Sequence, residues 1–175
     1  TYLRNYITSC RENKMEIDLR EVHFVSSKGK TEIDYVDMLA NANIKGAQFH
    51  GPVLMIGKQK PRQIKGILNF NHCVFHHDVI FKNCVFCSEI NIEHLTQRND
   101  FGVLNFQIED SVFEYFFEFN DPLDFCSNLR ISNCEFKEYA QFEQFFKQEN
   151  TIEIVENRFL KNFTFLNSEI DALCI

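Results

Sequence analysis

The chain has 175 residues, with 18 Lys and Arg against 25 Asp and Glu and a formal net charge of −7. This length suffices for one domain with its own core, and no apolar run approaches the roughly 18 residues of a membrane span. Residues 100–175 hold 5 basic against 15 acidic side chains, which argues against direct binding of nucleic acid because phosphate contacts need cations.

The first residues differ in pattern from the rest of the chain. Leu3, Tyr6, Ile7 and Cys10 fall at helical spacing and give a short helix one apolar face. We predict that residues 1–16 form a helical cap over the repetitive structure that follows, because the ends of such structures need covering. A helix at an interface with a partner is the alternative.

From residue 17 onward a hexapeptide pattern recurs. An apolar residue is followed three positions later by a small residue and five positions later by Phe. The copies begin at Leu19, Ile44, Phe70, Phe81, Ile108, Ile131, Ile154 and Phe165. The sixth position is Phe in every copy except the last, and the chain contains 20 Phe and no Trp. This balance indicates a core that repeats one large side chain as a ladder.

The spacing of the copies predicts the fold class. Phe113, Phe136 and Phe159 lie 23 residues apart, whereas Phe70 and Phe81 lie 11 apart. The unit is therefore about 11 residues, two units make a period of 22 or 23, and such a period is typical of a solenoid. Apolar residues alternate within each unit, which indicates short strands with one buried face. We predict an all-β fold, a parallel β-helix with about 22–23 residues per coil over residues 17–175.

Bend residues occupy the third position of several copies. They are Asn83, Asp110, Asn133 and Asn167. Asn and Asp suit bends because their side chains bond to the local backbone and tolerate unusual dihedral angles.

Two consecutive segments resemble the repeats of the pentapeptide-repeat family. They are Ala42-Asn-Ile-Lys-Gly46 and Ala47-Gln-Phe-His-Gly51, and in that family Ala or Cys precedes a central Leu or Phe by two positions. The same pairing occurs at Cys73 and Phe75, Cys84 and Phe86, and Cys134 and Phe136. The resemblance covers roughly residues 42–170, where units of 5 and 6 residues alternate. It implies a right-handed, four-sided β-helix with small and large side chains inside.

Four segments lack the repeat, near residues 25–41, 57–66, 93–102 and 120–126. We expect loop insertions there, which in solenoids often lie on the binding face. In the first segment, Thr31-Glu-Ile-Asp34 resembles a capping box, so a short helix with Ile33, Val36, Leu39 and Ala40 could follow, and a strand is the rival interpretation.

In the second segment, residues 57–66, Pro61 argues against a central strand. Its basic side chains, Lys58, Lys60, Arg62 and Lys65, either are solvated or contact an anionic partner.

One cluster suggests a metal site. His72, Cys73, His76, His77 and Asp78 precede Cys84-Val-Phe-Cys87, and zinc sites use such ligands at such spacing. However, Cys84 takes the small interior position of the repeat, Cys87 follows the inward Phe and should point outward, and His72 takes the bend position. We therefore predict no metal and no cofactor.

The 7 Cys act mainly as small buried hydrophobes, which favours a reducing cytoplasm over a disulfide framework.

A catalytic site is the second chemical candidate. Asp110, Asn133 and Glu156 lie one coil apart, and some parallel β-helices cleave acidic polysaccharides with clustered acidic and basic side chains. Two carboxylates separated by an amide are more typical of a ladder of turns than of a catalytic pair, whose two pKa values must be driven apart. We predict no catalytic residues.

These observations predict a non-catalytic structural or protein-interaction module, part of a larger protein. We expect a protein partner, and a homodimer or end-on contact through residues 170–175, which are apolar and lack a polar cap. One alternative comes from the resemblance, since some pentapeptide-repeat proteins imitate DNA with an acidic rod and bind a type II topoisomerase. The other is a polysaccharide-active β-helix enzyme.

Overall fold

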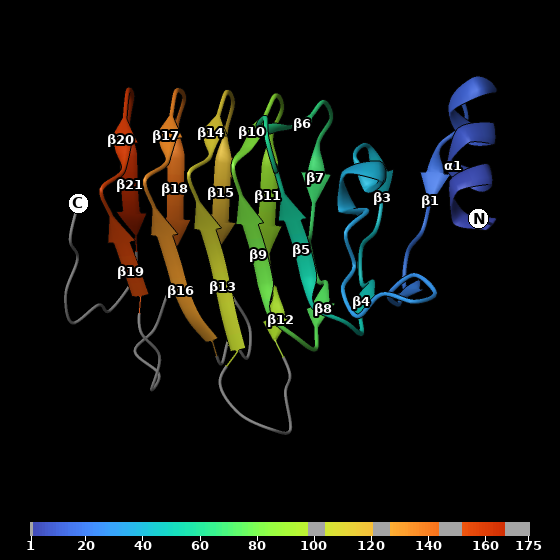
Figure 1. The fold of residues 1–175 in the computed structure, drawn as a ribbon. Coiled ribbons are helices and arrows are strands. Elements are labelled where there is room, and N and C mark those ends of the chain that lie inside the picture. Colours follow the sequence, from blue (N-terminus) through green and yellow to red (C-terminus); the bar gives the residue numbers. More distant parts are fainter. Residues whose placement is uncertain (1, 98–103, 121–126, 144–151, 167–175) are drawn as a thin grey trace.

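The computed structural model describes residues 2–97, 104–120, 127–143 and 152–166. In these residues the chain winds through about six stacked coils of short parallel strands, with one helix at the N-terminal end (Figure 1). The fold is a β-solenoid of the right-handed type, which confirms the predicted fold class. No helix among the described residues is long and apolar enough to cross a membrane.

Four parallel sheets form the walls of the solenoid. Wall 1 contains β5 (Val53–Ile56), β9 (Val79–Lys82), β13 (Leu104–Glu109), β16 (Ser127–Ser132) and β19 (Ile152–Val155). Wall 2 contains β6 (Arg62–Ile64), β10 (Cys84–Phe86), β14 (Val112–Phe113), β17 (Glu135–Phe136) and β20 (Arg158–Phe159). Wall 3 contains β7 (Leu68–Asn69), β11 (Ile90–Glu93), β15 (Phe117–Asn120), β18 (Ala140–Glu143) and β21 (Phe163–Leu166). Wall 4 contains β2 (His23–Phe24), β4 (Gln48–Phe49), β8 (Val74–Phe75) and β12 (Thr96–Gln97). A fifth, two-stranded pair joins β1 (Ile17–Asp18) to β3 (Ala42–Asn43).

The register places equivalent repeat positions above one another. Phe86 pairs with Phe113, Phe113 with Phe136 and Phe136 with Phe159, all in wall 2. The last two steps are coils of 23 residues, as predicted, but the first step is 27 residues. The coil length is therefore less regular than the predicted 22–23, because the connections between walls differ in length while the strands keep their register. Phe86, Phe113 and Phe136 are buried, as the repeat predicted.

In the copies that begin at Phe81, Ile108, Ile131 and Ile154, the third position turns the chain between wall 1 and wall 2. Asn83, Asp110, Asn133 and Glu156 have φ angles of 52°, 51°, 52° and 56°, in the left-handed region. Asn and Asp enter this region more readily than other side chains because they can bond to the local backbone. The predicted bends are thus confirmed at Asn83, Asp110 and Asn133, whereas Asn167 lies outside the described residues.

The N-terminal helix covers the first coil. Helix α1 spans Tyr2–Glu12, buries Ile7 and Cys10, and packs Leu3 and Tyr6 against the same core, so the four residues of the predicted apolar face are those that meet the core. Arg11 on its last turn donates hydrogen bonds from Nη2 to the carbonyl oxygens of Met38 and Ala40, at 3.0 and 3.2 Å.

Residues 25–41 complete the first coil rather than forming an insertion. Ile33 makes a parallel bridge to Val53 of wall 1, and Val36–Leu39 form a 3₁₀ helix, η1, that packs against β5. Ile33, Val36, Leu39 and Ala40 are buried. The predicted capping box is absent, because η1 begins after Tyr35 without a side-chain cap. These aliphatic side chains fill the interior in place of Phe, which explains why the repeat was not visible here.

Two other expected insertions contain strands. Arg62–Ile64 form β6, the end strand of wall 2, directly after Pro61. Proline disfavours a central strand, but it is compatible with the start of an edge strand. Thr96–Gln97 form β12 of wall 4, and Leu95 is buried. The segment 121–126 and the predicted contact at 170–175 lie outside the described residues.

Candidate functional site

The residues of the suspected zinc cluster are separated in the structure. The thiol of Cys84 is buried and donates a hydrogen bond to the carbonyl oxygen of Met55, at 3.2 Å. The thiol of Cys87 is partly exposed and lies 3.7 Å from Oε1 of Gln63. Among the described residues, no group of three or more His, Cys, Asp or Glu is placed to hold a metal ion.

The other members of that cluster have structural contacts. His72 adopts the left-handed turn conformation, with a φ of 56°, and its ring stacks on that of His94. Burial and the nearby Lys45 lower the pKa of His72. The carboxylate of Asp78 accepts a hydrogen bond from the backbone N–H of Asn105, at 2.9 Å. His72 and Asp78 therefore stabilise turns between coils.

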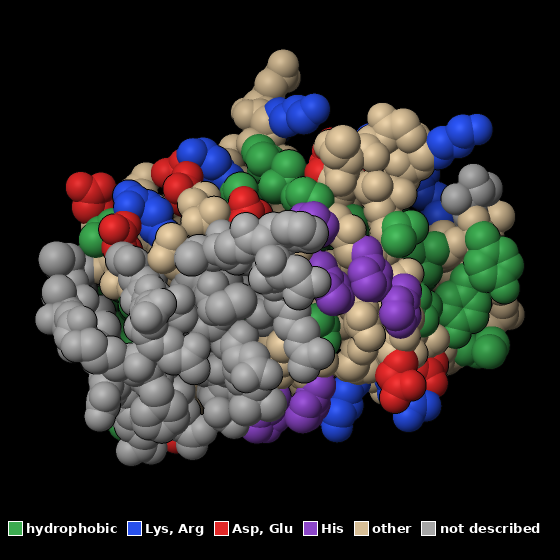
Figure 2. Space-filling model, turned by 90° about the horizontal axis from the view of Figure 1, so that it is seen from below, with side chains coloured by type: hydrophobic (Ala, Val, Ile, Leu, Met, Phe, Trp, Pro, Cys, Tyr) green, Lys and Arg blue, Asp and Glu red, His purple; other side chains and the backbone are tan. Residues whose placement is uncertain are grey.

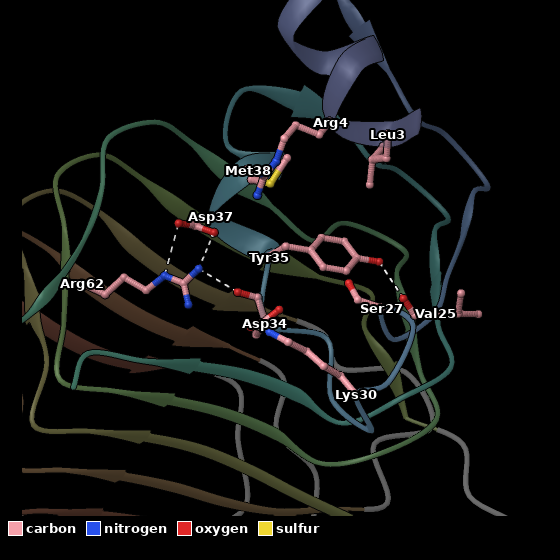
Figure 3. Close-up of a pocket in the computed structure, with 10 residues that line it drawn as sticks. All are labelled: Leu3, Arg4, Val25, Ser27, Lys30, Asp34, Tyr35, Asp37, Met38 and Arg62. Carbon is pink, nitrogen blue, oxygen red and sulfur yellow. Dashed lines mark hydrogen bonds and ion pairs between the residues drawn. The ribbon is translucent and has the colours of Figure 1, made fainter. Parts of the chain in front are cut away.

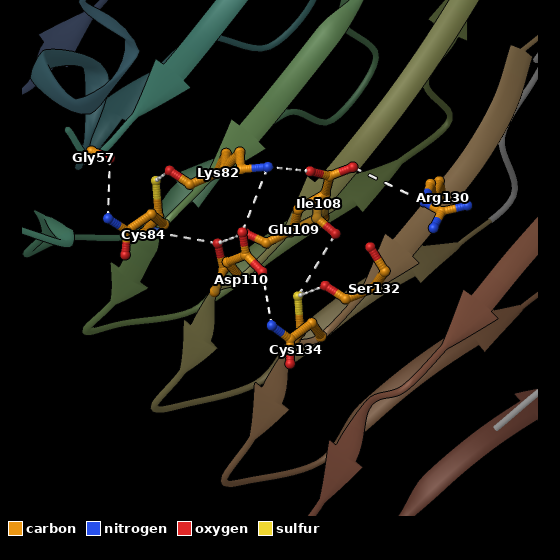
Figure 4. Close-up of polar contacts among 12 residues, drawn as sticks. Gly57, Lys82, Cys84, Ile108, Glu109, Asp110, Arg130, Ser132 and Cys134 are labelled. Atoms are coloured by element: carbon orange, nitrogen blue, oxygen red, sulfur yellow. Dashed lines mark hydrogen bonds and ion pairs between the residues drawn. The ribbon is translucent and has the colours of Figure 1, made fainter.

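The interior Cys and Ser side chains satisfy the backbone between walls 1 and 2 (Figure 4). The backbone N–H of Cys84 donates to Oγ of Ser111 at 3.1 Å, and Ser111 in turn donates to the carbonyl oxygen of Glu109 at 2.7 Å. Two coils after Cys84, the backbone N–H of Cys134 donates to Oδ1 of Asn157 at 2.9 Å. Burial raises the pKa of the Cys84 thiol to about 11 and that of the Cys134 thiol to about 12. Such thiols are protonated near neutral pH and are poor nucleophiles.

The stacked polar residues Asp110, Asn133 and Glu156 form a ladder of turns. Nδ2 of Asn133 donates a hydrogen bond to Oδ1 of Asp110, at 2.7 Å, and Nζ of Lys82 lies 3.5 Å from Oδ2 of Asp110. The side-chain amide of Asn133 thus links two consecutive turns. It does not separate a catalytic acid from a catalytic base. This geometry supports the structural interpretation of the stack.

Ion pairs between successive coils offset part of the acidic charge of residues 100–175. Lys82 pairs with Glu109, Arg130 with Glu153, Lys137 with Glu114, Arg158 with Glu135, and Lys161 with Glu138. These partly exposed pairs stabilise the fold only weakly, because water and salt screen them. The pairs have a larger effect on the electrostatic field at the surface. Because these carboxylates are matched by cations, the net negative field is weaker than the number of carboxylates alone would indicate.

The predicted basic loop contributes one residue to a cavity at the N-terminal end (Figure 3). The cavity has a volume of about 560 Å³ and lies between α1, residues 25–38 and Arg62. Arg62 forms two hydrogen bonds to the carboxylate of Asp37, at 2.6 and 3.2 Å, and one to the carbonyl oxygen of Asp34, at 2.7 Å. Lys30 pairs with the carboxylate of Asp34. Arg62 therefore holds residues 34–37 in place through these hydrogen bonds and is not part of a solvated loop.

The chemistry of this cavity favours packing over catalysis. Burial and the nearby Asp34 raise the pKa of Tyr35, whose hydroxyl donates to the carbonyl oxygen of Val25 at 2.8 Å. The hydrogen bond from Lys30 lowers the pKa of Asp34. These shifts move both groups away from neutral pH, where a general acid or base works best. Two of the three lining cations, Lys30 and Arg62, are neutralised by carboxylates of the site itself, and Arg4 is the third.

A different surface carries apolar side chains that the solenoid does not require. The turns joining wall 2 to wall 3 lie side by side at the top of Figure 1. In the turn between β14 and β15, Tyr115 and Phe116 are 53% and 46% exposed. At the same positions of the preceding coil the chain has Ser88 and Glu89, so the fold tolerates polar residues here.

Tyr139 of the next turn, which is partly buried, extends this aromatic cluster. Its ring meets that of Phe116 edge to face, with the ring centroids 6.1 Å apart. We call Tyr115, Phe116 and Tyr139 the aromatic edge. Sequence reasoning missed it, although a signal was present: the alternation that places Phe117 and Phe119 inside requires Phe116 to point outward.

Carboxylates gather on the outer face of wall 3, beside the aromatic edge. Glu118 of β15 lies among acidic side chains, and burial together with the charges of Glu89, Glu93 and Glu143 raises its pKa. We call Glu93, Glu118 and Glu143 the acidic face. A cation placed there would relieve this mutual repulsion.

The fold and these surfaces define the chain as a β-solenoid with an aromatic edge and an acidic face. Comparison with protein-family models, with curated proteins and with solved structures finds no match.

Proposed function

We propose that this chain is a non-catalytic protein-interaction module, in which the solenoid holds the aromatic edge in a fixed position for a protein partner. The observation that carries the proposal is the exposure of Tyr115 and Phe116 at turn positions where the preceding coil has Ser88 and Glu89. The exposed part of these two aromatic side chains gives no stability to the folded chain, since that apolar area remains in water.

Aromatic residues are the common anchors of protein interfaces. Tyr and Phe are enriched in the buried centre of an interface, and Tyr is prominent among the few residues that dominate binding energy. The aromatic edge stands on turns whose neighbouring strands pair in register, so little conformational freedom of the backbone is lost on binding. Glu114 with Lys137 and Glu138 with Lys161 form ion pairs on the same turns, and such charged groups suit the polar rim of an interface.

The acidic face determines the charge of the partner that fits. Because the carboxylates around Glu118 repel one another, a segment with Lys or Arg beside its apolar side chains would gain from both surfaces at once. The proposed partner is thus a basic, apolar segment of another protein. The ion pairs between coils weaken the case for a DNA mimic, which needs unmatched negative charge along its length.

A peptide-display selection tests this function. Random peptides are selected on the wild-type chain and counter-selected on the Phe116→Ser variant, and the survivors are measured by isothermal titration calorimetry. We expect peptides that combine Lys or Arg with large apolar residues, and binding that weakens about tenfold or more in Phe116→Ser, as for a residue that anchors an interface.

The matched control is Ile56→Ser, which removes another exposed apolar side chain, located in wall 1. This variant should bind the selected peptides as the wild type does. If the survivors bind all three proteins equally, or if no peptide survives the counter-selection, the aromatic edge is not the binding surface.

Two further parts of the proposal concern the family to which the chain is related and the cellular compartment in which it lies. The αL turns and the small and large residues at alternating interior positions support a relationship to pentapeptide-repeat proteins. The five cysteines in the described part of the chain are free thiols, four of them buried, which supports a reducing compartment such as the cytoplasm.

A further inference from the structure

Histidine side chains form a row on the surface of wall 4. The rings of His23 and His50 stack with centroids 4.9 Å apart and planes 18° apart, and those of His50 and His76 with 4.5 Å and 13°. Figure 2 shows histidines gathered on this face of the molecule. The chain has 6 His in all, so this row concentrates half of them along three successive coils.

The backbone that carries the row is paired between neighbouring coils. The backbone N–H of His50 donates to the carbonyl oxygen of Phe24 at 2.9 Å, and that of His76 donates to the carbonyl oxygen of Phe49 at 3.0 Å. Inside the wall, Phe24, Phe49 and Phe75 form a second stack, with centroid distances of 4.9 and 4.6 Å. The coil repeat therefore sets the spacing of His50 and His76, which follow the paired Phe49 and Phe75. His23 precedes Phe24 and pairs with Gln48, so its ring reaches that of His50 diagonally across the two strands.

Two nitrogens of the row approach each other closely. Nε2 of His50 lies 2.9 Å from Nδ1 of His23. In the neutral pair one nitrogen carries a proton and the other presents a lone pair, so the two rings share a single proton. When the donor imidazole takes its other tautomer, with the proton on the ring nitrogen that faces away, both facing nitrogens present lone pairs to a metal ion beside the line that joins them.

The separation of the two nitrogens suits adjacent ligands of one ion. Metal–imidazole bonds are about 2.0–2.1 Å long. Two such bonds at a right angle place the nitrogens about 2.9 Å apart, whereas a tetrahedral angle places them about 3.3 Å apart. Right angles are typical of Cu²⁺ and Ni²⁺ in tetragonal sites with nitrogen and oxygen ligands.

We propose that His23 and His50 form a surface site for a divalent transition-metal ion of the Cu²⁺ or Ni²⁺ type, bound through Nδ1 and Nε2. Both side chains are exposed, so the ion reaches them from solvent and water fills its remaining positions. His76 stacks on the other side of His50 and contacts Oε1 of Gln48 at 3.2 Å, which restricts rotation of the His50 ring. The site has two protein ligands, in keeping with the absence of any three-residue cluster among the described residues.

Titration of the full chain with Cu²⁺ at about pH 7.5 tests the site. Calorimetry gives the affinity, and electron paramagnetic resonance with its spin-echo modulation counts the coordinated imidazoles. We expect one site with two imidazole nitrogens, and affinity for Cu²⁺ above that for Zn²⁺, following both geometry and the general order of divalent metals.

Single substitutions identify the ligands. His50→Gln and His23→Gln should each weaken Cu²⁺ binding by roughly tenfold or more, and the spectrum should lose one imidazole. The control is His77→Gln, which removes another exposed imidazole next to the row and should leave both readouts unchanged. Circular dichroism of each variant without metal verifies folding.

Two results would overturn the proposal. One is an equal loss of affinity in His77→Gln and His50→Gln, which would indicate nonspecific binding to surface histidines. The other is a Cu²⁺ spectrum without two imidazole nitrogens in the wild-type chain, which would place the ion elsewhere. The peptide selection on the aromatic edge is independent of this outcome, because the two surfaces lie on different walls.

Discussion

The rings of Phe113 and Phe136 stack with their planes 1° apart and their centroids 4.5 Å apart. Their strands, β14 and β17, pair in parallel with these two residues in register, so the same side chain recurs in the same rotameric environment one coil later. Phe86 and Phe159 extend the column at either end, with centroid distances of 4.8 and 4.9 Å. Aromatic pairs of this kind add about 0.5–1.5 kcal/mol beyond the area that they bury.

Removal of one ring from this column should strongly destabilise the fold. We expect Phe113→Ala to lower the free energy of unfolding by about 3–5 kcal/mol, because it opens a cavity between two stacked rings. Urea unfolding followed by circular dichroism gives the value. Phe116→Ala is the matched control, since the same side chain is exposed three residues away, and it should change stability by no more than about 0.5 kcal/mol. Similar losses in both variants would contradict the packing role of the column.

The hydroxyl of Ser111 should contribute as much to the free energy of unfolding as a larger side chain does. Ser111 is 1% exposed, and its Oγ is the acceptor for the backbone N–H of Cys84 in the preceding coil. Ser111→Ala leaves this buried donor without a partner, so we expect a loss of about 1–3 kcal/mol in the free energy of unfolding. The partly exposed Ser88 provides the comparison, and Ser88→Ala should have a much smaller effect. A loss in Ser111→Ala no larger than in Ser88→Ala would show that water or a shifted backbone satisfies the donor.

The sequence predicted the column and the turns because each depends on local pattern and period. Phe113 and Phe136 are separated by one coil, and Asn133 is a residue that favours the left-handed turn. The sequence did not reveal β12, because Gln97 stands where the repeat usually has Phe, and it did not reveal β6, because Pro61 argues against a central strand. In both places the pairing of neighbouring coils, a contact between residues distant in sequence, determines the structure.

The candidate surfaces were harder to predict for a similar reason. Phe116 looks like one more Phe of a Phe-rich unit until the register assigns its neighbour Phe117 to the interior. His23, His50 and His76 are separated by unequal intervals. An alignment on the buried Phe24, Phe49 and Phe75 gives His50 and His76 the same position after the Phe, whereas His23 precedes its Phe and joins the row only through its contact with His50. A side chain on the outer face leaves no periodic signal of its own, since the surface tolerates many residues at each position.

Glu156 is a further test of the turn ladder. It has a φ of 56°, although Glu lacks the short polar side chain that helps Asn and Asp in this conformation. We expect Glu156→Gly to raise the free energy of unfolding by about 1 kcal/mol relative to Glu156→Ala, because only glycine avoids the steric cost of a positive φ. Both variants remove the same charge, so thermal or urea unfolding isolates the backbone effect. If Glu156→Gly is no more stable than Glu156→Ala, the turn is not strained.

The buried thiols should make the fold sensitive to alkaline pH. Burial raises the pKa of Cys73 to about 12, and the pKa values of Cys84 and Cys134 are raised to about 11 and about 12. Below the ordinary thiol pKa, near 9.0, both states keep these protons and the contribution to stability is complete. Above it the unfolded chain loses them while the folded chain retains them, so stability falls as the pH rises toward the folded values.

Urea unfolding under reducing conditions at about pH 8, 9 and 10 measures this loss, with a slope of up to about 1.4 kcal/mol per pH unit for each thiol. Stopping near pH 10 limits the contribution of Lys82 and Lys137, whose pKa values Glu109 and Glu114 raise above an ordinary value of 10.5. The control is Cys73→Ala, which should be less stable at every pH but should show a shallower decline above pH 9, because one of the three thiols is gone. A decline as steep as that of the wild type would mean that the Cys73 thiol does not contribute to it.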